Sequence, residues 1–328
     1  MSPAKAGQKG SVVGLDRRAS QARRSICSGR NIVFTLLQHA LSMGRYPKEV
    51  CELAGNMLPV GLALSGGTAK AVTHVGIIKA LVEAEIPINY IAATSGGSMV
   101  GAFYASGMPI SSILQVANSL SWSKLIALRF SRLGFVSSKR IQNFVTEVIG
   151  NVEFKDLKTP CQIVATDLAT GGKRVFRRGA VALAVRASCS IPQIFLPVEI
   201  DGIYYVDGGF SEYLPVETLR EMEQEVFVIG ASLADERSIY RRPRNYLQLA
   251  MHVMGLIAKT NYRVSAPKAD VLIHPDMENY SPFDFDASEE LIELGYNTTR
   301  DMIPEIKEKW KHKSSRLRRM LSKLSPLR

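Results

Sequence analysis

The sequence has 328 residues, of which 46% are hydrophobic and 22% are charged. This composition is that of an ordinary globular protein, and the length allows one large domain or two small ones. The formal net charge is +11, and the excess of Lys and Arg lies in residues 1–55 and 296–328. Because the rest of the chain is close to neutral, the charge argues against a nucleic-acid-binding fold.

The four cysteines show no C-x-x-C or other paired spacing, and the sequence contains no H-E-x-x-H motif. We therefore expect reduced thiols in a cytoplasmic protein, with no metal site. Residues 1–25 are basic but lack the apolar stretch of a secretory signal. The early apolar segment at residues 31–43 is too short to cross a bilayer, so we expect no transmembrane helix.

In chain order, the first 30 residues are rich in Ser, Gly, Lys and Arg and are predicted to be disordered. Residues 31–54 are expected to form one or two helices, and residues 71–84 another. Strands are predicted at residues 60–64, 87–93, 161–165, 226–231 and 271–274. This alternation predicts a three-layer α/β/α fold with a largely parallel central sheet.

A serine stands at a sharp corner between a predicted strand and a predicted helix. Ser95 follows an apolar run that ends at Ala93 and precedes Gly96 and Gly97. Small residues permit such a tight turn, and the N-terminus of the next helix favours negative charge near the hydroxyl. The pattern is typical of a nucleophile elbow, with Ala93 in place of the first glycine. Small residues also occur at such corners for packing alone.

A glycine-rich turn follows the first predicted strand. Gly66, Gly67 and Thr68 open a helix, so backbone amides there could face a phosphate or the oxyanion of an acyl-transfer reaction. Lys70 is followed by Ala71 rather than Ser or Thr, which excludes a Walker P-loop, and the G-x-G-x-x-G pattern is absent. Close packing of a strand against a helix is the alternative explanation.

A serine nucleophile needs a base, and the sequence offers two arrangements. Asp207 follows a predicted hairpin with Asp201-Gly202 at its turn, so its carboxylate is expected at the exit of a strand. His274 also ends a predicted strand, and the order Ser95, Asp207, His274 matches an α/β-hydrolase triad. Otherwise Asp207 takes the proton from Ser95 directly, as a dyad. An Asx-type turn would explain Asp207 without catalysis.

Four segments together resemble the bacterial patatin-like phospholipase family. They occur in the family's order and spacing, and the resemblance covers residues 58–300. The segments are residues 65–76, 94–97, 187–192 and 207–209. The resemblance implies a metal-independent serine lipid acyl hydrolase of the phospholipase A, lysophospholipase or esterase type. It implies no cofactor, and a lipid or acyl ester as substrate.

The resemblance also implies roles for individual residues. Ser95 and Asp207 correspond to a catalytic dyad. The amides of Gly66, Gly67 and Thr68 correspond to the oxyanion hole. Residues that match the motifs in a supporting role are Lys70, Thr94, Gly97, Gly208 and Gly209.

The glycine-rich turn departs from the family pattern. Thr68 stands where a third glycine is common, and Lys70-Ala71 stands where Arg-Gly is usual. A β-branched residue stiffens the loop whose amides must point at the oxyanion, which lowers the expected turnover. The alternative function is therefore a low-turnover lipid-binding or regulatory module on the same fold.

Four further polar residues are interpreted as structural. His74 matches a family histidine that is not the general base. Asp167 ends a predicted strand and is expected to form a turn or to support one. Ser188 and Ser190 are expected to cap or line a helix-to-loop transition before Pro192.

A basic helix is predicted from Pro304 onward. Its apolar residues share one face, surrounded by Lys and Arg: Ile306, Trp310, Leu317, Leu321 and Leu324. Such a helix can lie on an anionic membrane surface or pack its apolar face on the domain. A lipid substrate favours the membrane, which would make the protein a cytoplasmic, peripheral membrane hydrolase that binds lipid surfaces through residues 304–328.

Three regions are therefore predicted along the chain. Residues 1–55 are a basic extension, partly disordered and then helical. Residues 56–300 are the patatin-like catalytic domain, and residues 301–328 are the basic amphipathic helix. The sequence indicates no oligomeric state.

Overall fold

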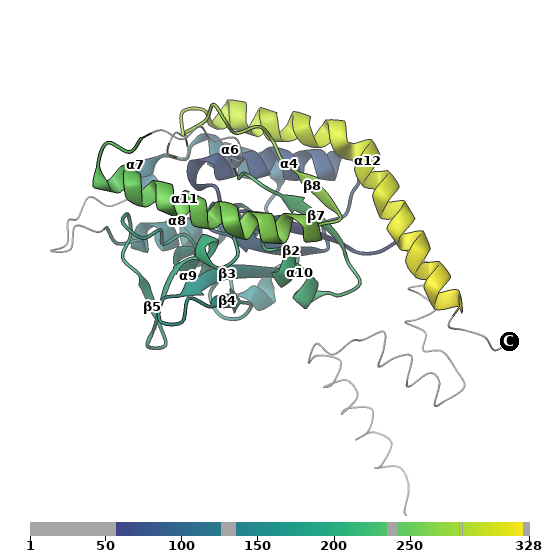
Figure 1. The fold of residues 1–328 in the computed structure, drawn as a ribbon, viewed down its shortest axis with the longest axis horizontal. Coiled ribbons are helices and arrows are strands. Elements are labelled where there is room, and N and C mark those ends of the chain that lie inside the picture. Colours follow the sequence, from purple (N-terminus) through teal and green to yellow (C-terminus); the bar gives the residue numbers. More distant parts are fainter. Residues whose placement is uncertain (1–56, 126–135, 235–241, 282, 284, 324–328) are drawn as a thin grey trace, which may run out of the picture. The chain divides into compact units, whose positions relative to one another are not determined.

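Short apolar runs form the strands of a mixed sheet (Figure 1). The strands are β1 Val60–Leu64, β2 Tyr90–Thr94, β3 Cys161–Asp167, β4 Lys173–Phe176, β5 Val198–Ile200, β6 Ile203–Asp207, β7 Phe227–Ala231 and β8 Val271–Ile273. Their order across the sheet is β5-β6-β3-β2-β1-β7-β8, with β4 also paired to β3. Strands β3, β2, β1, β7 and β8 run parallel. Strands β4 and β6 pair antiparallel with β3, and β5 pairs antiparallel with β6.

The structure, a computed structural model, describes residues 57–125, 136–234, 242–281, 283 and 285–323. The predictions for residues 1–55 lie outside this part of the chain. The α-helices are α4 Thr73–Glu83, α5 Gly96–Ala105, α6 Ile110–Asn118, α7 Trp122–Leu125, α8 Lys139–Ile149, α9 Val181–Ser188, α10 Val216–Met222, α11 Tyr246–Ser265 and α12 Ser288–Lys323. The short 3-10 helices are η1 Thr68–Val72, η2 Phe154–Asp156, η3 Gly208–Phe210 and η4 Ala266–Lys268.

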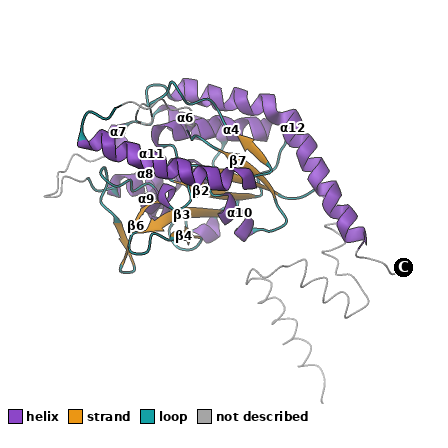
Figure 2. Ribbon diagram, viewed as in Figure 1, coloured by secondary structure: helices purple, strands orange, loops and turns teal. Residues whose placement is uncertain are grey.

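Side chains of the central strands alternate between two apolar clusters, one on each face of the sheet. On β1, Leu62 and Leu64 belong to the cluster that α4, α5 and α9 complete. Ala63, between them, belongs to the cluster that contains Leu219 of α10 and Tyr262 of α11. Because both faces are covered by helices (Figure 2), the central strands are apolar throughout. The predicted three-layer α/β/α fold with a largely parallel sheet is confirmed.

Helix α12 begins earlier than the sequence predicted. It starts at Ser288, and Pro304 lies inside it. The predicted boundary between residues 300 and 301 therefore falls within a continuous helix. Glycine at position 76 lets α12 approach α4 closely, because a Cβ atom there would clash with the carbonyl oxygen of Ile292.

The apolar face of α12 packs on the domain as far as Leu317. Ile306 is fully buried, and Leu317 packs against the larger core cluster. Trp310 donates its indole N–H to the carbonyl oxygen of Leu58 at 2.7 Å, and the Leu58 amide donates to Ser314 Oγ at 3.0 Å. These contacts use the apolar face on which the membrane prediction for residues 304–328 depended. The side chains of residues 321 and 324 lie outside the described part of the chain.

Candidate active site

Ser95 occupies a strained corner between β2 and α5. Its backbone has φ 51° and ψ −130°, a conformation that costs a non-glycine residue about 1–3 kcal/mol. The first turn of α5 lies directly on the end of β1, because Gly97 has no Cβ to clash with the carbonyl oxygen of Ser65. The corner thus presents the serine hydroxyl beside the N-terminus of a helix.

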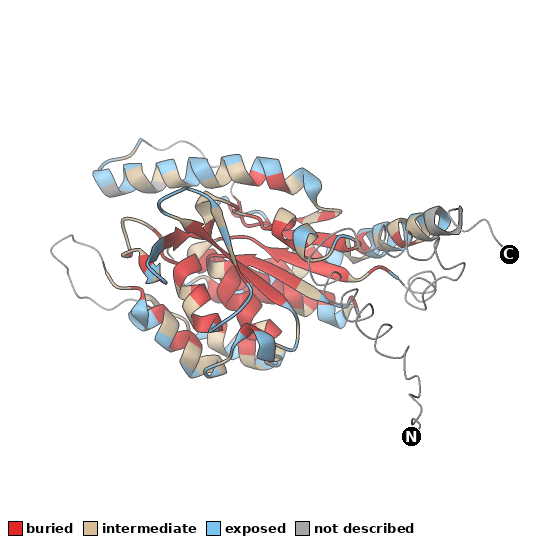
Figure 3. Cartoon of the chain, turned by 90° about the horizontal axis from the view of Figure 1, so that it is seen from below, coloured by how far each residue is buried: buried red, intermediate tan, exposed pale blue. Residues whose placement is uncertain are grey.

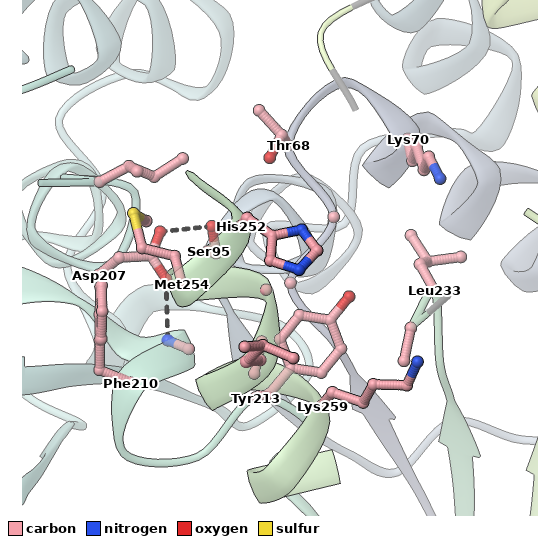
Figure 4. A pocket seen from close by; sticks show the side chains of 18 of the residues that line it. Thr68, Lys70, Ser95, Asp207, Phe210, Tyr213, Leu233, His252, Met254 and Lys259 are labelled. Carbon is pink, nitrogen blue, oxygen red and sulfur yellow. Dashed lines mark hydrogen bonds between the residues drawn. The ribbon is translucent and has the colours of Figure 1, made fainter. Parts of the chain in front are cut away.

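The hydroxyl of Ser95 contacts a carboxylate from another strand. Ser95 Oγ donates to Asp207 Oδ2 at 2.6 Å, and Asp207 is the last residue of β6 (Figure 4). The other oxygen, Asp207 Oδ1, accepts the amide of Gly209 at 2.8 Å. Each carboxylate oxygen therefore has a defined partner, and one of the two partners is the serine.

Burial changes the acidity of this carboxyl group. Asp207 is only 5% exposed, and loss of hydration raises its pKa to about 6. The hydrogen bonds from Ser95 and Gly209 oppose the increase because they favour the ionised form. An Asp with this pKa is still ionised at neutral pH and is a stronger base than an ordinary Asp.

Two buried serines hold the backbones of Ser95 and Asp207. The amide of Ser95 donates to Ser188 Oγ at 2.8 Å, and Ser188 Oγ donates to the Val164 carbonyl oxygen at 2.6 Å. The amide of Asp207 donates to the carbonyl oxygen of Ser190 at 3.0 Å. Both serine side chains are fully buried, so neither is accessible as a nucleophile. The sequence predicted a structural role but not this link between the two site residues.

The glycine-rich turn differs from the predicted oxyanion hole. The amide of Gly66 donates to the carbonyl oxygen of Tyr213 at 3.1 Å, so this N–H is already in use. The amides of Gly67 and Thr68, at the start of η1, have no hydrogen-bond acceptor among the described residues. First-turn amides of a helix normally lack such acceptors and bind anions. Of the three amides predicted for the oxyanion hole, that of Gly66 therefore already has an acceptor in the structure.

Thr68 itself has an unfavourable backbone conformation. Its φ is 54°, in the left-handed region that glycine adopts freely and a β-branched residue does not. Where the family that the sequence resembles commonly has a third glycine, this chain therefore has a residue whose backbone conformation must be stabilised by surrounding contacts.

Neither His74 nor His274 forms a triad with Ser95. His74 is fully buried, its Nε2 contacts the carbonyl oxygen of Ser65 at 3.0 Å, and burial lowers its pKa to about 4. It therefore supports the glycine-rich turn as a neutral ring. His274 follows β8 and stacks on Tyr262, with ring centroids 5.8 Å apart. His274 does not line the cavity that contains Ser95. The Ser95 hydroxyl instead donates its hydrogen bond directly to the carboxylate of Asp207.

The remaining motif residues have structural contacts. Thr94 donates its hydroxyl to the carbonyl oxygen of Glu212 at 2.9 Å. Lys70 is buried and donates to the carbonyl oxygen of Met277 at 3.0 Å, which ties η1 to the segment after β8. Gly208 begins η3, the turn that carries the amide of Gly209 to Asp207. Asp167 accepts the amide of Ala169 at 2.8 Å, as an Asx turn does.

Two cavities meet at Ser95. The larger has a volume of about 520 Å³ and contains Asp207 and the whole glycine-rich turn. The smaller, of about 60 Å³, is lined mostly by apolar side chains, including Met99, Trp122 and Phe195. Ser95 lines both, so a carbonyl group bound there would have a roomy side with a mixed polar and apolar lining and a narrow, apolar side.

Helix α11 forms a wall of the larger cavity that the sequence did not indicate. His252, Met254 and Lys259 of this helix line it, and Figure 4 shows them around the same space as Ser95. Nothing in the sequence pattern joins residues so far apart in the chain to the Ser95 turn. No group of His, Cys, Asp and Glu that could hold a metal ion occurs among the described residues, and none of the described helices has the length and hydropathy to cross a bilayer.

Comparison with known proteins agrees with the resemblance seen in the sequence. Residues 62–220 match the family model of patatin-like phospholipases. This stretch includes the Ser95 corner, the glycine-rich turn and Asp207.

Relatives with curated names share this region. An uncharacterized NTE family protein of Mycobacterium tuberculosis is 33% identical over 172 residues, 52% of this chain and 48% of that protein. Lysophospholipase NTE1 of Saccharomyces cerevisiae is 26% identical over 272 residues, 74% of this chain and 16% of that protein. The chain spans about half, or less, of the length of these relatives. The structure of VipD from Legionella pneumophila is similar with a TM-score of 0.47 and 18% identity, over 76% of this chain and 67% of that one.

Proposed function

We propose that this protein is a serine hydrolase that cleaves acyl esters of lipids. The observation that carries the proposal is the 2.6 Å hydrogen bond from Ser95 Oγ to the buried carboxylate of Asp207, at a strained corner that opens into a cavity. The family of the domain and the lysophospholipase name of the yeast relative support lipid esters as the substrate class.

The proposed reaction uses the contacts of the site in two steps. Ser95 Oγ attacks the ester carbonyl carbon while its proton passes to Asp207 Oδ2, and the amides of Gly67 and Thr68 bind the resulting oxyanion. Collapse of the tetrahedral intermediate breaks the ester C–O bond, and Asp207 returns the proton to the departing alcohol. Asp207 then takes a proton from the water that attacks the acyl-enzyme. When the second tetrahedral intermediate collapses, Asp207 returns this proton to Ser95 Oγ and the fatty acid is released.

The two cavities favour a lipid in a particular orientation. The narrow apolar cavity beside Met99 and Trp122, of about 60 Å³, can take only the first carbons of an acyl chain, and the larger cavity has room for the rest of the ester. Burial of a hydrocarbon chain contributes about 0.8 kcal/mol for each methylene group removed from water. The protein residues alone supply the nucleophile, base and oxyanion donors of this reaction.

The test is hydrolysis of a panel of soluble acyl esters and phospholipids by the wild type and by Ser95→Ala. We expect the Ser95→Ala rate to fall at least about a thousandfold, towards background. Ser106→Ala is the matched control, because Ser106 ends the same helix and its hydroxyl only contacts the carbonyl oxygen of Phe103. Equal rates for wild type and Ser95→Ala would refute the proposal.

A low-turnover lipid-binding module is the second candidate. The occupied amide of Gly66 and the strained backbone of Thr68 favour it, because both weaken oxyanion stabilisation. This candidate predicts that phospholipids bind to the protein without any hydrolysis that depends on Ser95.

A further inference from the structure

Helix α11 carries a row of apolar side chains that face solvent. The residues of this row are separated by three, four, three, one and seven positions, which places them on one side of the helix. They are Tyr246, Leu249, Val253, Leu256, Ile257 and Val264, with exposed fractions between 37% and 77%. Large apolar residues are seldom gathered in this way on a soluble surface unless something binds them. We call this row the α11 stripe.

Other residues of α11 attach it to the domain, so the stripe is a true outer face. Asn261 donates to the carbonyl oxygens of Gly209 and Phe210 at 3.2 and 2.7 Å. Tyr262 and Ser265 are buried, and Met254 packs against the core. Figure 3 shows exposed residues along most of this helix, whereas the neighbouring sheet is buried.

The charged residues of α11 and of the segments directly before and after it have one sign. Residues 242–268 contain five Lys and Arg residues and no Asp or Glu. Arg242 and Arg244 precede the helix and Arg263 lies in its last turn, and all three are exposed. Apolar and cationic side chains on one helix are the combination that binds anionic lipid surfaces.

The stripe is continuous with the mouth of the larger cavity. Leu256 is 53% exposed as part of the stripe and also lines the cavity that holds Ser95. Lys259, three residues further, lines the same cavity. A surface that covered the stripe would therefore lie at the entrance through which a substrate reaches Ser95.

We propose that the α11 stripe docks the protein on an anionic phospholipid bilayer, with the entrance of the larger cavity at the bilayer surface. The proposal depends on the proposed function, which supplies the reason for contact with lipid. A second copy of this chain fits the stripe less well, because a symmetric contact would bring the exposed Arg242, Arg244 and Arg263 of two copies together.

The test compares two double variants that add the same charge. Leu249→Glu/Val253→Glu places two carboxylates on the stripe, at positions 48% and 46% exposed that do not line the cavity. Leu168→Glu/Ile203→Glu is the matched control, at positions 53% and 40% exposed outside α11. Cosedimentation with phosphatidylcholine vesicles that contain about 30 mol% phosphatidylglycerol measures docking. Hydrolysis of a water-soluble short-chain ester and of phospholipid in vesicles are measured in parallel.

We expect the stripe variant to lose vesicle binding and vesicle hydrolysis at least about tenfold, because carboxylates are repelled by an anionic surface and resist burial in it. Its soluble-ester rate should stay within about twofold of wild type, and the control should match wild type in every assay. Equal vesicle binding by wild type and stripe variant would overturn the proposal. So would a wild-type dimer in sedimentation equilibrium that the stripe variant abolishes. Vesicle binding without any hydrolysis by wild type would refute the proposed function and leave the docking surface intact.

Discussion

Helices α11 and α12 are both long, basic and amphipathic, yet their apolar faces meet different surroundings. In α12 the apolar face is covered by the domain, with Ile306 fully buried and Trp310 bonded to Leu58. In α11 the apolar stripe faces solvent, with Leu256 and Val264 more than half exposed. A sequence pattern therefore identifies an amphipathic helix, but not what its apolar face contacts. The membrane surface expected for α12 belongs, in our proposal, to α11.

The largest expected difference between the two helices is in stability. Ile306→Ala removes a fully buried side chain from α12 and should lower the free energy of unfolding by about 2–4 kcal/mol. Ile257→Ala makes the same chemical change on the stripe, at a position 37% exposed, and should alter it by less than about 1 kcal/mol. Urea unfolding of the two variants measures this difference, and similar losses would show that the stripe also supports the fold.

The next prediction concerns Asp207, next to the η3 turn that α11 contacts. A pKa raised to about 6 means that the native state holds this proton more tightly than the unfolded chain, so stability falls as pH rises through the interval from 3.8 to about 6. Asp207→Asn removes this penalty but weakens one hydrogen bond. We expect the variant to be about 1–3 kcal/mol more stable than wild type at pH 8.

Denaturant unfolding at several pH values checks the sign. The advantage of Asp207→Asn should shrink as pH falls from about 6 and disappear only below 3.8, where wild-type Asp207 becomes protonated in the unfolded chain as well. An advantage that grows at low pH would contradict the account of this carboxyl group.

Loss of the hydrogen bonds that attach the two helices to the domain should lower stability in both cases, but should slow ester hydrolysis only for α11. Trp310→Phe removes the 2.7 Å hydrogen bond of α12 to Leu58 and should cost about 1 kcal/mol of stability without slowing ester hydrolysis.

Asn261→Ala removes the hydrogen bonds of α11 to Gly209 and Phe210, at a cost of about 1–2 kcal/mol of stability. Because Gly209 donates to Asp207, we also expect a lower kcat for this variant. A kcat equal to wild type would show that α11 does not help to position Asp207.

The smallest expected effect is at Thr68, on the same cavity that α11 lines. Thr68→Gly relieves the strain of φ 54° but makes the unfolded chain more flexible. We expect a net gain in stability of no more than about 1 kcal/mol, measured by thermal unfolding. A loss of stability would mean that the threonine side chain contributes contacts that outweigh its backbone strain.

Much of the fold could be predicted from local patterns. Apolar runs located β1, β3, β7 and β8 to within a few residues, since strands buried on both faces are apolar throughout. Strand β4, Lys173–Phe176, was not predicted, because it is short and only partly buried at the sheet edge. The early start of α12 was missed because Pro304 suggested a helix beginning, whereas a proline can also lie inside a long helix.

The site was predictable only where its residues stand in short motifs. The Ser95 corner and the glycine-rich turn each follow a parallel strand, so the sequence places them at one edge of the sheet. Asp207 ends β6, which runs antiparallel to β3, so only the family resemblance joined it to them. The bond from Gly66 to Tyr213 and the cavity wall of α11 depend on contacts between distant segments, which no local pattern contains.

The central claim is that Asp207 activates Ser95, and labelling with a fluorophosphonate ester tests it most directly. The rate of phosphonylation, with the modified residue located by mass spectrometry, should rise with pH as the carboxyl group of pKa about 6 ionises and level off above about pH 7. The label should be on Ser95, and Asp207→Asn should react at least about a hundredfold more slowly. Labelling of another residue, or an unchanged rate in Asp207→Asn, would contradict the account.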